Sequence, residues 1–195
     1  MERCGKTYTK NDMVEELYTL NEGIITRTVA KKSVDNLFKL LNDELTDFNS
    51  VTLRHVDTLV PRKRSGGRPV RNPKTGETKL MHDDVTVKLK GKSVTPMEIN
   101  EKVTHTILQD KLSDMSYSPK VAEDTLSIFL GLLKEISQGA GRMEVRNFGI
   151  FYSKWNDERN SRNPATGEKV IAKAGWSLGY KCSKKLKKVL TQKYI

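Results

Sequence analysis

One seven-residue phrase occurs twice in this chain, and the two copies begin 91 residues apart. Residues 71–77 read Arg-Asn-Pro-Lys-Thr-Gly-Glu, and residues 162–168 repeat them with alanine in place of lysine. Repeats that stack into solenoids recur every 20 to 50 residues or so. The longer spacing therefore indicates one small domain present in two copies. Each copy has a proline at a turn and an arginine two residues before it.

The charge balance predicts a polyanionic partner. The chain has 35 Lys and Arg against 24 Asp and Glu, a formal net charge of +11. Such an excess attracts nucleic acids and anionic membrane surfaces alike. The longest strongly apolar run, residues 128–133, contains a glycine and is far shorter than the roughly 20 residues of a spanning helix. We therefore expect a nucleic acid rather than a membrane as the partner and, without a signal peptide or lipidation motif, a cytoplasmic protein.

The sequence offers no metal, cofactor or catalytic site. Cys4 and Cys182 are far apart, and His55, His82 and His105 lack the spacing of metal ligands. No nucleophile and no acid–base pair emerges from the pattern. We therefore expect a protein that is not an enzyme and binds no cofactor or metal, with two unpaired thiols.

The same order of elements is predicted twice. In residues 1–94, Thr9 followed by Asp12 indicates a helix start. Apolar residues three and four apart predict a second helix, and alternating residues predict strands. A basic, glycine-rich segment, residues 62–68, leads into the first phrase. The predicted elements are a helix from Thr9, a helix over about 26–45 and strands over 51–60 and 78–89.

Residues 95–195 repeat this order. Thr95, Pro96 and Glu98 have the pattern of a capping residue, a first-turn proline and an acidic third residue. A helix is therefore predicted from near residue 96 to about 112, and we expect it to end the first copy and start the second. The other predicted elements are a helix from Ser118 and Pro119, strands over 143–152 and 169–174, and a basic helix over 184–190.

This order of elements resembles the bacterial histone-like HU and integration host factor (IHF) family. The resemblance rests on Asn-Phe-Gly-Ile-Phe at 147–151, on residues 159–166, and on Tyr180 with 183–187, where serine replaces the usual glycine. It implies an α+β fold of two tandem HU/IHF-like units that form an intramolecular pseudo-dimer. Each unit would have two helices, a three-stranded antiparallel sheet with a protruding β-ribbon arm, and a C-terminal helix. The expected arms span about 60–80 in unit 1–94 and about 153–172 in unit 95–195.

The resemblance also implies the mode of binding to double-stranded DNA. Pro73 and Pro164 would intercalate from the minor groove and kink the duplex. Asn-Pro and Thr-Gly also form ordinary turns, so it is their repetition with basic flanks that favours DNA contact. The other residues expected to contact DNA are Arg62, Lys63, Arg64, Arg68, Arg71, Asn72, Lys74, Lys154, Arg159, Arg162, Asn163, Lys169, Lys173, Lys181, Lys184 and Lys185.

The two copies differ in charge and in faithfulness to the family pattern. Residues 62–71 contain five basic residues and no acidic one, whereas Asp157 and Glu158 weaken the field of the second arm. The first copy has His-Val-Asp-Thr-Leu at 55–59 where the second has the Phe-Gly pattern. Trp155 has two interpretations: packing at the base of the arm, or stacking on DNA.

We expect a nucleoid-associated architectural protein that bends and compacts DNA in a bacterial cell, a phage-infected cell or a virion. One alternative is a sequence-specific, IHF-like assembly factor for recombination, packaging or transcription. The other is an interaction protein that pairs with or displaces host HU-like subunits. Because the two copies could complete each other's core, we expect a monomer that acts as a pseudo-heterodimer, with a homodimer as the alternative.

Overall fold

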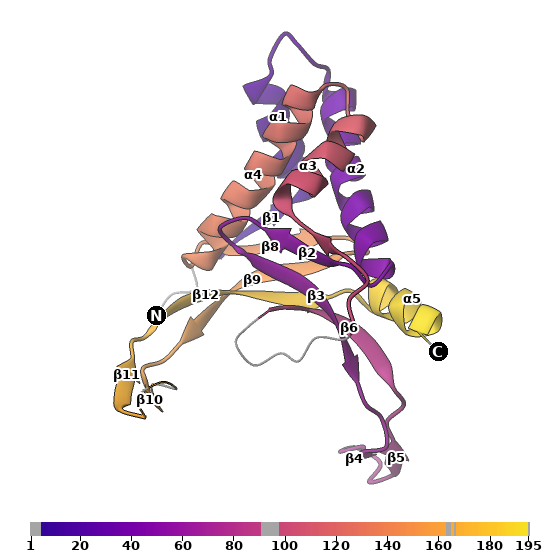
Figure 1. Ribbon diagram of the computed structural model, residues 1–195, viewed down its shortest axis with the longest axis vertical. Coiled ribbons are helices and arrows are strands. Elements are labelled where there is room, and N and C mark those ends of the chain that lie inside the picture. The colour runs from indigo at the N-terminus through magenta and orange to yellow at the C-terminus, as the bar shows by residue number, and fades with distance from the viewer. Residues whose placement is uncertain (1–4, 91–97, 163–164, 166, 195) are drawn as a thin grey trace.

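The computed structural model describes residues 5–90, 98–162, 165 and 167–194. Figure 1 shows a helical body at one end, β-sheets beneath it, and two β-ribbon arms that project away from the helices. Within the described residues, no helix is long and apolar enough to cross a membrane. The molecule is thus divided into a body that buries its apolar residues and two arms that extend from it.

The first copy begins with the predicted helix. The Thr9 hydroxyl and the Thr9 backbone N–H both donate to Asp12 Oδ2 at 2.7 Å, which fixes the first turn. The bond from the hydroxyl, and then the bond from the backbone, lower the pKa of the Asp12 carboxyl. The second helix begins after Thr26, whose hydroxyl accepts the Val29 N–H at 3.4 Å. The elements of this copy are β1 (Lys6–Thr9), α1 (Lys10–Leu20), α2 (Arg27–Thr46), β2 (Ser50–Leu53), β3 (Asp57–Arg64), β4 (Pro69–Arg71), β5 (Thr78–Leu80) and β6 (Asp84–Leu89).

The second copy follows the same order after a short strand. Both predicted helices after residue 118 are confirmed, and Ser118 caps the first of them by accepting the Val121 N–H at 3.3 Å. Its elements are β7 (Lys102–Val103), α3 (His105–Met115), α4 (Pro119–Ser137), β8 (Gly141–Val145), β9 (Gly149–Asn156), β10 (Arg159–Arg162), β11 (Lys169–Ala172), β12 (Gly175–Cys182) and α5 (Lys184–Tyr194).

The single strands predicted over 51–60 and 143–152 are wrong, because each is a hairpin. The chain reverses at His55 between β2 and β3 and at Asn147 between β8 and β9. These two residues have φ angles of 62° and 67°, in the left-handed region where His and Asn are enriched among non-glycine residues. The return strand predicted over 78–89 is likewise interrupted, between β5 and β6. The one predicted over 169–174 is confirmed as β11 as far as Ala172, and β12, which follows it, was not predicted.

The helix predicted over about 96–112 is wrong over residues 98–104 and is confirmed only from His105 onward. Residues 98–101 are not helical, β7 follows them, and α3 begins only after Thr104. The Asn100 side chain donates to the Asp47 carbonyl at 2.7 Å, and Glu101 accepts the Ser50 N–H at 2.9 Å. These bonds to the first copy override the local capping signal. One continuous helix therefore does not join the copies; Thr95, Pro96 and the boundary between residues 94 and 95 lie outside the described residues.

The two copies exchange their first strands. β1 pairs in parallel with β8, and β7 pairs in parallel with β2, where Val103 lies opposite Val51. The resulting sheets have the orders β1-β8-β9-β12 and β6-β3-β2-β7. Each sheet thus has the three expected antiparallel strands of one copy plus one strand of the other. The intramolecular pseudo-dimer is confirmed.

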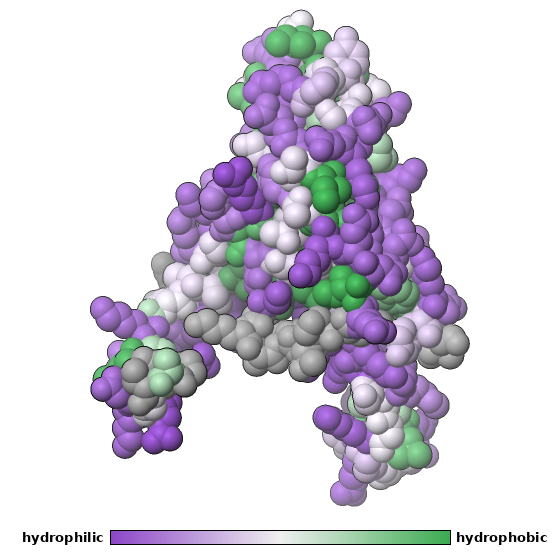
Figure 2. Space-filling view, in the orientation of Figure 1, coloured by the Kyte–Doolittle hydropathy of each residue, from purple (hydrophilic) through white to green (hydrophobic). Residues whose placement is uncertain are grey.

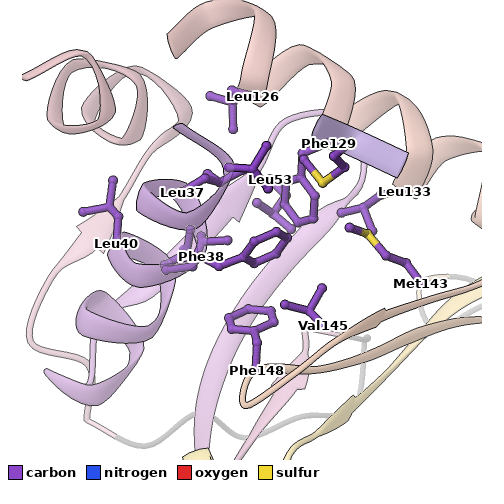
Figure 3. Packing of buried hydrophobic residues seen from close by; sticks show 14 of the residues in the cluster. Leu37, Phe38, Leu40, Leu53, Leu126, Phe129, Leu133, Met143, Val145 and Phe148 are labelled. Atoms are coloured by element: carbon purple, nitrogen blue, oxygen red, sulfur yellow. The ribbon is translucent and has the colours of Figure 1, made fainter. Parts of the chain in front are cut away.

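The apolar core is shared between the copies. The buried side chains form one cluster that draws on the helices and sheets of both. Phe38 of α2 lies 5.4 Å from Phe129 of α4 and 5.7 Å from Phe148 of the β8–β9 turn, measured between ring centroids. Figure 3 shows these three rings directed toward one another beneath the helices. Burial of this kind is the main stabilising contribution in a small domain, so each copy depends on the other for its core.

Within the described residues, α5 is the one helix that follows the last strand of its own copy. It belongs to the second copy but packs on the first. The Thr191 hydroxyl accepts the Val85 N–H of β6 at 3.1 Å, and Lys187 pairs with Asp84. Tyr194 packs against Phe48, just after α2. In the second copy, Trp176 occupies the corresponding place after α4. The expected C-terminal helix is thus found in the second unit.

Trp176 can take this place because residue 139 is a glycine. Gly139 has a φ of 104°, and a Cβ there would lie 2.9 Å from the Trp176 ring. The residue at the same place in the first copy, Phe48, meets the ring of Tyr194 instead. The place after α2 in the first copy is thus covered by helix α5, and the place after α4 in the second copy is covered by the Trp176 indole.

Candidate nucleic-acid interface

Asn72 closes the tip of arm one (residues 60–83). Its N–H donates to the Glu77 carbonyl and its carbonyl accepts the Gly76 N–H, both at 2.8 Å. Its side-chain Oδ1 accepts the Lys74 N–H at 3.0 Å. Pro73, the first residue of the turn, is exposed at the end of the arm. The tip therefore presents a rigid apolar ring that has no N–H to satisfy.

Two glycines bend arm one between β3 and β4. The Gly66 N–H donates to Asp83 Oδ1 at 2.6 Å, and the Gly67 N–H donates to the Met81 carbonyl at 2.8 Å. A Cβ on Gly66 would lie 2.7 Å from the Asp83 nitrogen, and Gly67 has a φ of 79°. Gly66 leaves no room for a Cβ, and Gly67 has a backbone conformation that favours glycine. The two glycines therefore fix the bend.

Lys63 holds the root of arm one. Its ammonium pairs with Asp83 Oδ2 at 2.9 Å and donates to the Tyr194 hydroxyl of α5 at 3.2 Å. The bond to Asp83 raises the pKa of Lys63, while the Gly66 N–H lowers the pKa of Asp83. Lys63 was predicted to contact DNA, but in the free protein its charge is engaged within this network.

The other basic side chains predicted in arm one line its length. Residues 60–83 contain seven basic and two acidic residues. Figure 2 shows hydrophilic surface over both arms, with apolar patches on them; Val70 and Leu80 are exposed on arm one. Of the predicted contacts, Arg62 is half-buried, and the exposed ones are Arg64, Arg68, Arg71, Asn72 and Lys74.

Arm two (residues 153–174) has a weaker field. It contains five basic and three acidic residues. Strands β10 and β11 pair from Arg159 opposite Ala172 to Arg162 opposite Lys169. Asn163 and Pro164 lie outside the described residues. The predicted contacts that the structure finds exposed in this arm are Lys154, Arg159, Arg162, Lys169 and Lys173.

Trp155 packs at the base of arm two. Its ring lies 5.1 Å from that of Trp176, at an interplanar angle of 66°, an edge-to-face arrangement that stabilises aromatic pairs. Its indole N–H donates to Asp157 Oδ1 at 2.9 Å. The two indoles are 37% and 43% exposed. The packing interpretation of Trp155 is therefore confirmed.

Three predicted contacts lie on the body. Lys181 of β12 and Lys184 of α5 line one cavity together with Arg146, and Lys185 lines a neighbouring cavity with Lys10 and Arg146. The sequence did not single out Arg146 or Lys10, because isolated basic residues in turns and helices resemble ordinary solvated surface. The available signal was the position of Arg146 beside Asn147, in the segment that carries the family resemblance.

This geometry defines a class of protein. Two basic ribbons extend from one pseudo-symmetric α+β body, and within the described residues no group of three or more His, Cys, Asp or Glu side chains could hold a metal ion. The arrangement is that of an architectural DNA-binding protein. The sequence model of the family described as "Bacterial DNA-binding protein" matches residues 8–95 and again residues 103–191. The chain therefore belongs to this family and contains its domain twice.

Single-domain relatives match one copy at a time. The chain is 33% identical to integration host factor subunit beta of Dechloromonas aromatica, over 37% of this chain and 78% of that protein. It is 29% identical to integration host factor subunit alpha of Bdellovibrio bacteriovorus, over 43% of this chain and 76% of that protein. A solved cocrystal structure of Anabaena HU with DNA is similar with a TM-score of 0.36 and 26% identity, over 40% of this chain and 86% of that one. The family model that matches both copies and the integration host factor relatives confirm the resemblance to the HU and IHF family.

Proposed function

We propose that this protein bends and compacts double-stranded DNA by laying its two arms in the minor groove. The observation that carries the proposal is the pair of basic arms that project from the same side of one body (Figure 1). Lysines and arginines along the arms follow the phosphates, and the body lysines Lys181, Lys184 and Lys185 support the duplex between them. We place this activity in the nucleoid of a bacterial or phage-infected cell.

Pro73 and Pro164 act as wedges in this proposal. An apolar side chain that enters between two base pairs kinks the duplex, at an unstacking cost of a few kcal/mol per step. The exposed position of Pro73 and the closed turn behind it support this role. Contacts of Arg71 and Asn72 beside the tip offset the cost. Pro164 is assigned the same role from the repeated phrase.

Replacing Pro73 with alanine should reduce DNA bending more than DNA affinity, because the phosphate contacts of the arm remain while the wedge is lost. Energy transfer between dyes at the two ends of a duplex measures the bend, and anisotropy of the same duplex measures affinity. Pro69→Ala is the matched control, because Pro69 is exposed on the same arm but outside the tip. An equal loss of bending and affinity in Pro73→Ala would contradict the wedge.

The chain should act without a second subunit. Both strand exchanges, β1 with β8 and β7 with β2, are completed within one chain, so the pairing that joins the two copies is already made. Light scattering at micromolar concentration without DNA should give a mass near 22.1 kDa. A mass near twice that value would count against a self-contained monomer.

A second candidate function, that of a sequence-specific assembly factor, is favoured by the unequal charge of the arms. A strongly basic arm and a weaker one give the complex a direction along the DNA. Competition between a pool of random duplexes and any sequence enriched from it separates the two functions. A general compacting protein enriches none, whereas an assembly factor enriches an asymmetric site.

A further inference from the structure

Two cavities of nearly equal volume, about 460 and 450 Å³, occur at matching places in the two halves of the body. The first lies between the start of α1, helix α2, the β8–β9 turn and helix α5. The second lies between the start of α3, helix α4 and the β2–β3 turn. Both α1 and α3 begin directly after a threonine, with Lys10 and His105 respectively. Three walls of the two cavities therefore correspond, and the first cavity has a fourth wall from α5.

The two cavities differ in their chemistry. The first is lined by Lys10, Lys39, Arg146 and Lys185, which are charged at any physiological pH, and Lys10 pairs with Asp35 at 2.7 Å. In the second, His105 stands in place of Lys10, and His55 stands in place of the turn residue Asn147. Imidazoles change charge between about pH 5 and 8. The second cavity therefore has a pH-dependent positive charge at His105, in addition to the basic side chains of Arg54 and Lys134.

The groups that face His105 come from three elements. Arg54 and His55 belong to the β2–β3 turn, Gln109 to α3, and Glu123 and Lys134 to α4. Burial, and then the charges of Arg54 and His55, lower the pKa of His105. An anion placed among these groups reverses that effect, because it favours the protonated imidazole. Binding of an anion and uptake of a proton are therefore coupled, and anion affinity rises as the pH falls.

We propose that the second cavity binds a phosphate of the DNA backbone outside the segment held between the arms, and that it does so when His105 is protonated. The inference rests on the proposed DNA-binding function. All the residues that line this cavity belong to the body rather than to an arm, so DNA reaches it only where the duplex extends past the arms. In this proposal the first cavity binds DNA at every pH, and the second cavity adds a phosphate contact at low pH.

Two duplex lengths separate this contact from the contacts of the arms. The short duplex has about 11 base pairs, or one helical turn, and the long duplex has about 33 base pairs, or three turns. Only the long duplex extends past the arms to the second cavity. Affinities are measured by anisotropy at about pH 6 and about pH 8, at constant ionic strength. The ratio of long-duplex to short-duplex affinity should be up to about tenfold higher at the lower pH if the phosphate raises the pKa of His105 by about one unit. The His55→Asn, His105→Lys double variant, which installs the residues of the first cavity, should keep a high ratio at both pH values.

His82→Gln is the matched control. His82 lies in arm one, which contacts both duplexes in the proposed complex, so its replacement should leave their affinity ratio unchanged. A ratio that does not change with pH in the unmodified chain overturns the proposal, as does a double variant that keeps the full pH dependence. Loss of binding to both duplexes at every pH would instead contradict the DNA-binding function itself.

Calorimetry of the unmodified chain gives a second readout that does not depend on the folding of a variant. Titrations in two buffers of different ionisation enthalpy give the protons taken up on binding. The long duplex should take up more protons than the short one, and equal uptake overturns the proposal. Inorganic phosphate distinguishes the source of the anion. If it raises the pKa of His105 while the long duplex does not, the cavity is a small-anion site and the proposal is wrong.

Discussion

Replacing Phe38 with alanine should destabilise both copies together by about 3 to 5 kcal/mol. The Phe38 ring is 2% exposed and packs against Phe129 and Phe148 of the other copy. Urea unfolding followed by circular dichroism reports the whole chain. Tryptophan fluorescence reports the second copy alone, because both tryptophans, Trp155 and Trp176, lie there. Both probes should show the same single transition, shifted to lower urea.

A matched control is Leu20→Ala, because Leu20 is also an apolar helix residue of the first copy but is 61% exposed. This change should alter the free energy of unfolding by no more than about 0.5 kcal/mol. If Phe38→Ala shifts the circular dichroism signal and leaves the fluorescence transition in place, the copies unfold independently and the shared core is refuted.

Removing three arginines from arm one should weaken DNA binding by roughly 500-fold at about 0.1 M salt, if each contacts one phosphate. The unmodified protein, with about 6 to 10 phosphate contacts, should lose about 10³ to 10⁵ in affinity between 50 and 200 mM salt. In the Arg64→Ala, Arg68→Ala, Arg71→Ala variant, the slope of log affinity against log salt should become shallower by about 2.7. Anisotropy titrations over this salt range measure both quantities.

The matched variant in arm two is Lys154→Ala, Arg159→Ala, Arg162→Ala. Its loss of affinity should be smaller, because Asp157 and Glu158 lie among these residues and already offset part of their attraction for phosphate. Equal losses from the two triple variants would show that the charge difference between the arms has no effect on binding. An unchanged salt slope in the arm-one variant would show that its arginines do not contact phosphates.

Much of the fold could be predicted from the sequence because its signals are local. The bond between Thr9 and Asp12 and the cap at Ser118 act within one helical turn, and both helices begin where they were expected. The hairpins at His55 and Asn147 could not be predicted from alternation alone, because the apolar pattern continues across a tight turn. Their left-handed residues are not glycines, so the usual marker of such a turn is missing.

The errors and omissions concern contacts between distant parts of the chain. The capping pattern near residue 96 predicted a helix, but Val103 pairs with Val51 in the sheet of the first copy. Likewise, α5 was predicted as a helix, but the place where it packs could not be predicted. Its Lys187 pairs with Asp84, which lies 103 residues earlier in the chain. The arm residues could be proposed from the repeated phrase. The two body cavities could not be predicted, since the first is assembled from four separate elements, the second from three, and each from both copies.

The position of α5 has a consequence for synthesis on the ribosome. Chains emerge from the N-terminus, and the earlier domain of a tandem protein ordinarily folds first. Here β6 of the first copy is covered by residues 184–194, the last helix of the chain, and β1 pairs with β8, which is made much later. The apolar surface of the first half therefore stays incompletely covered until residues 184–194 have been synthesised. We expect its unpaired strands to be the part of the nascent chain that chaperones recognise.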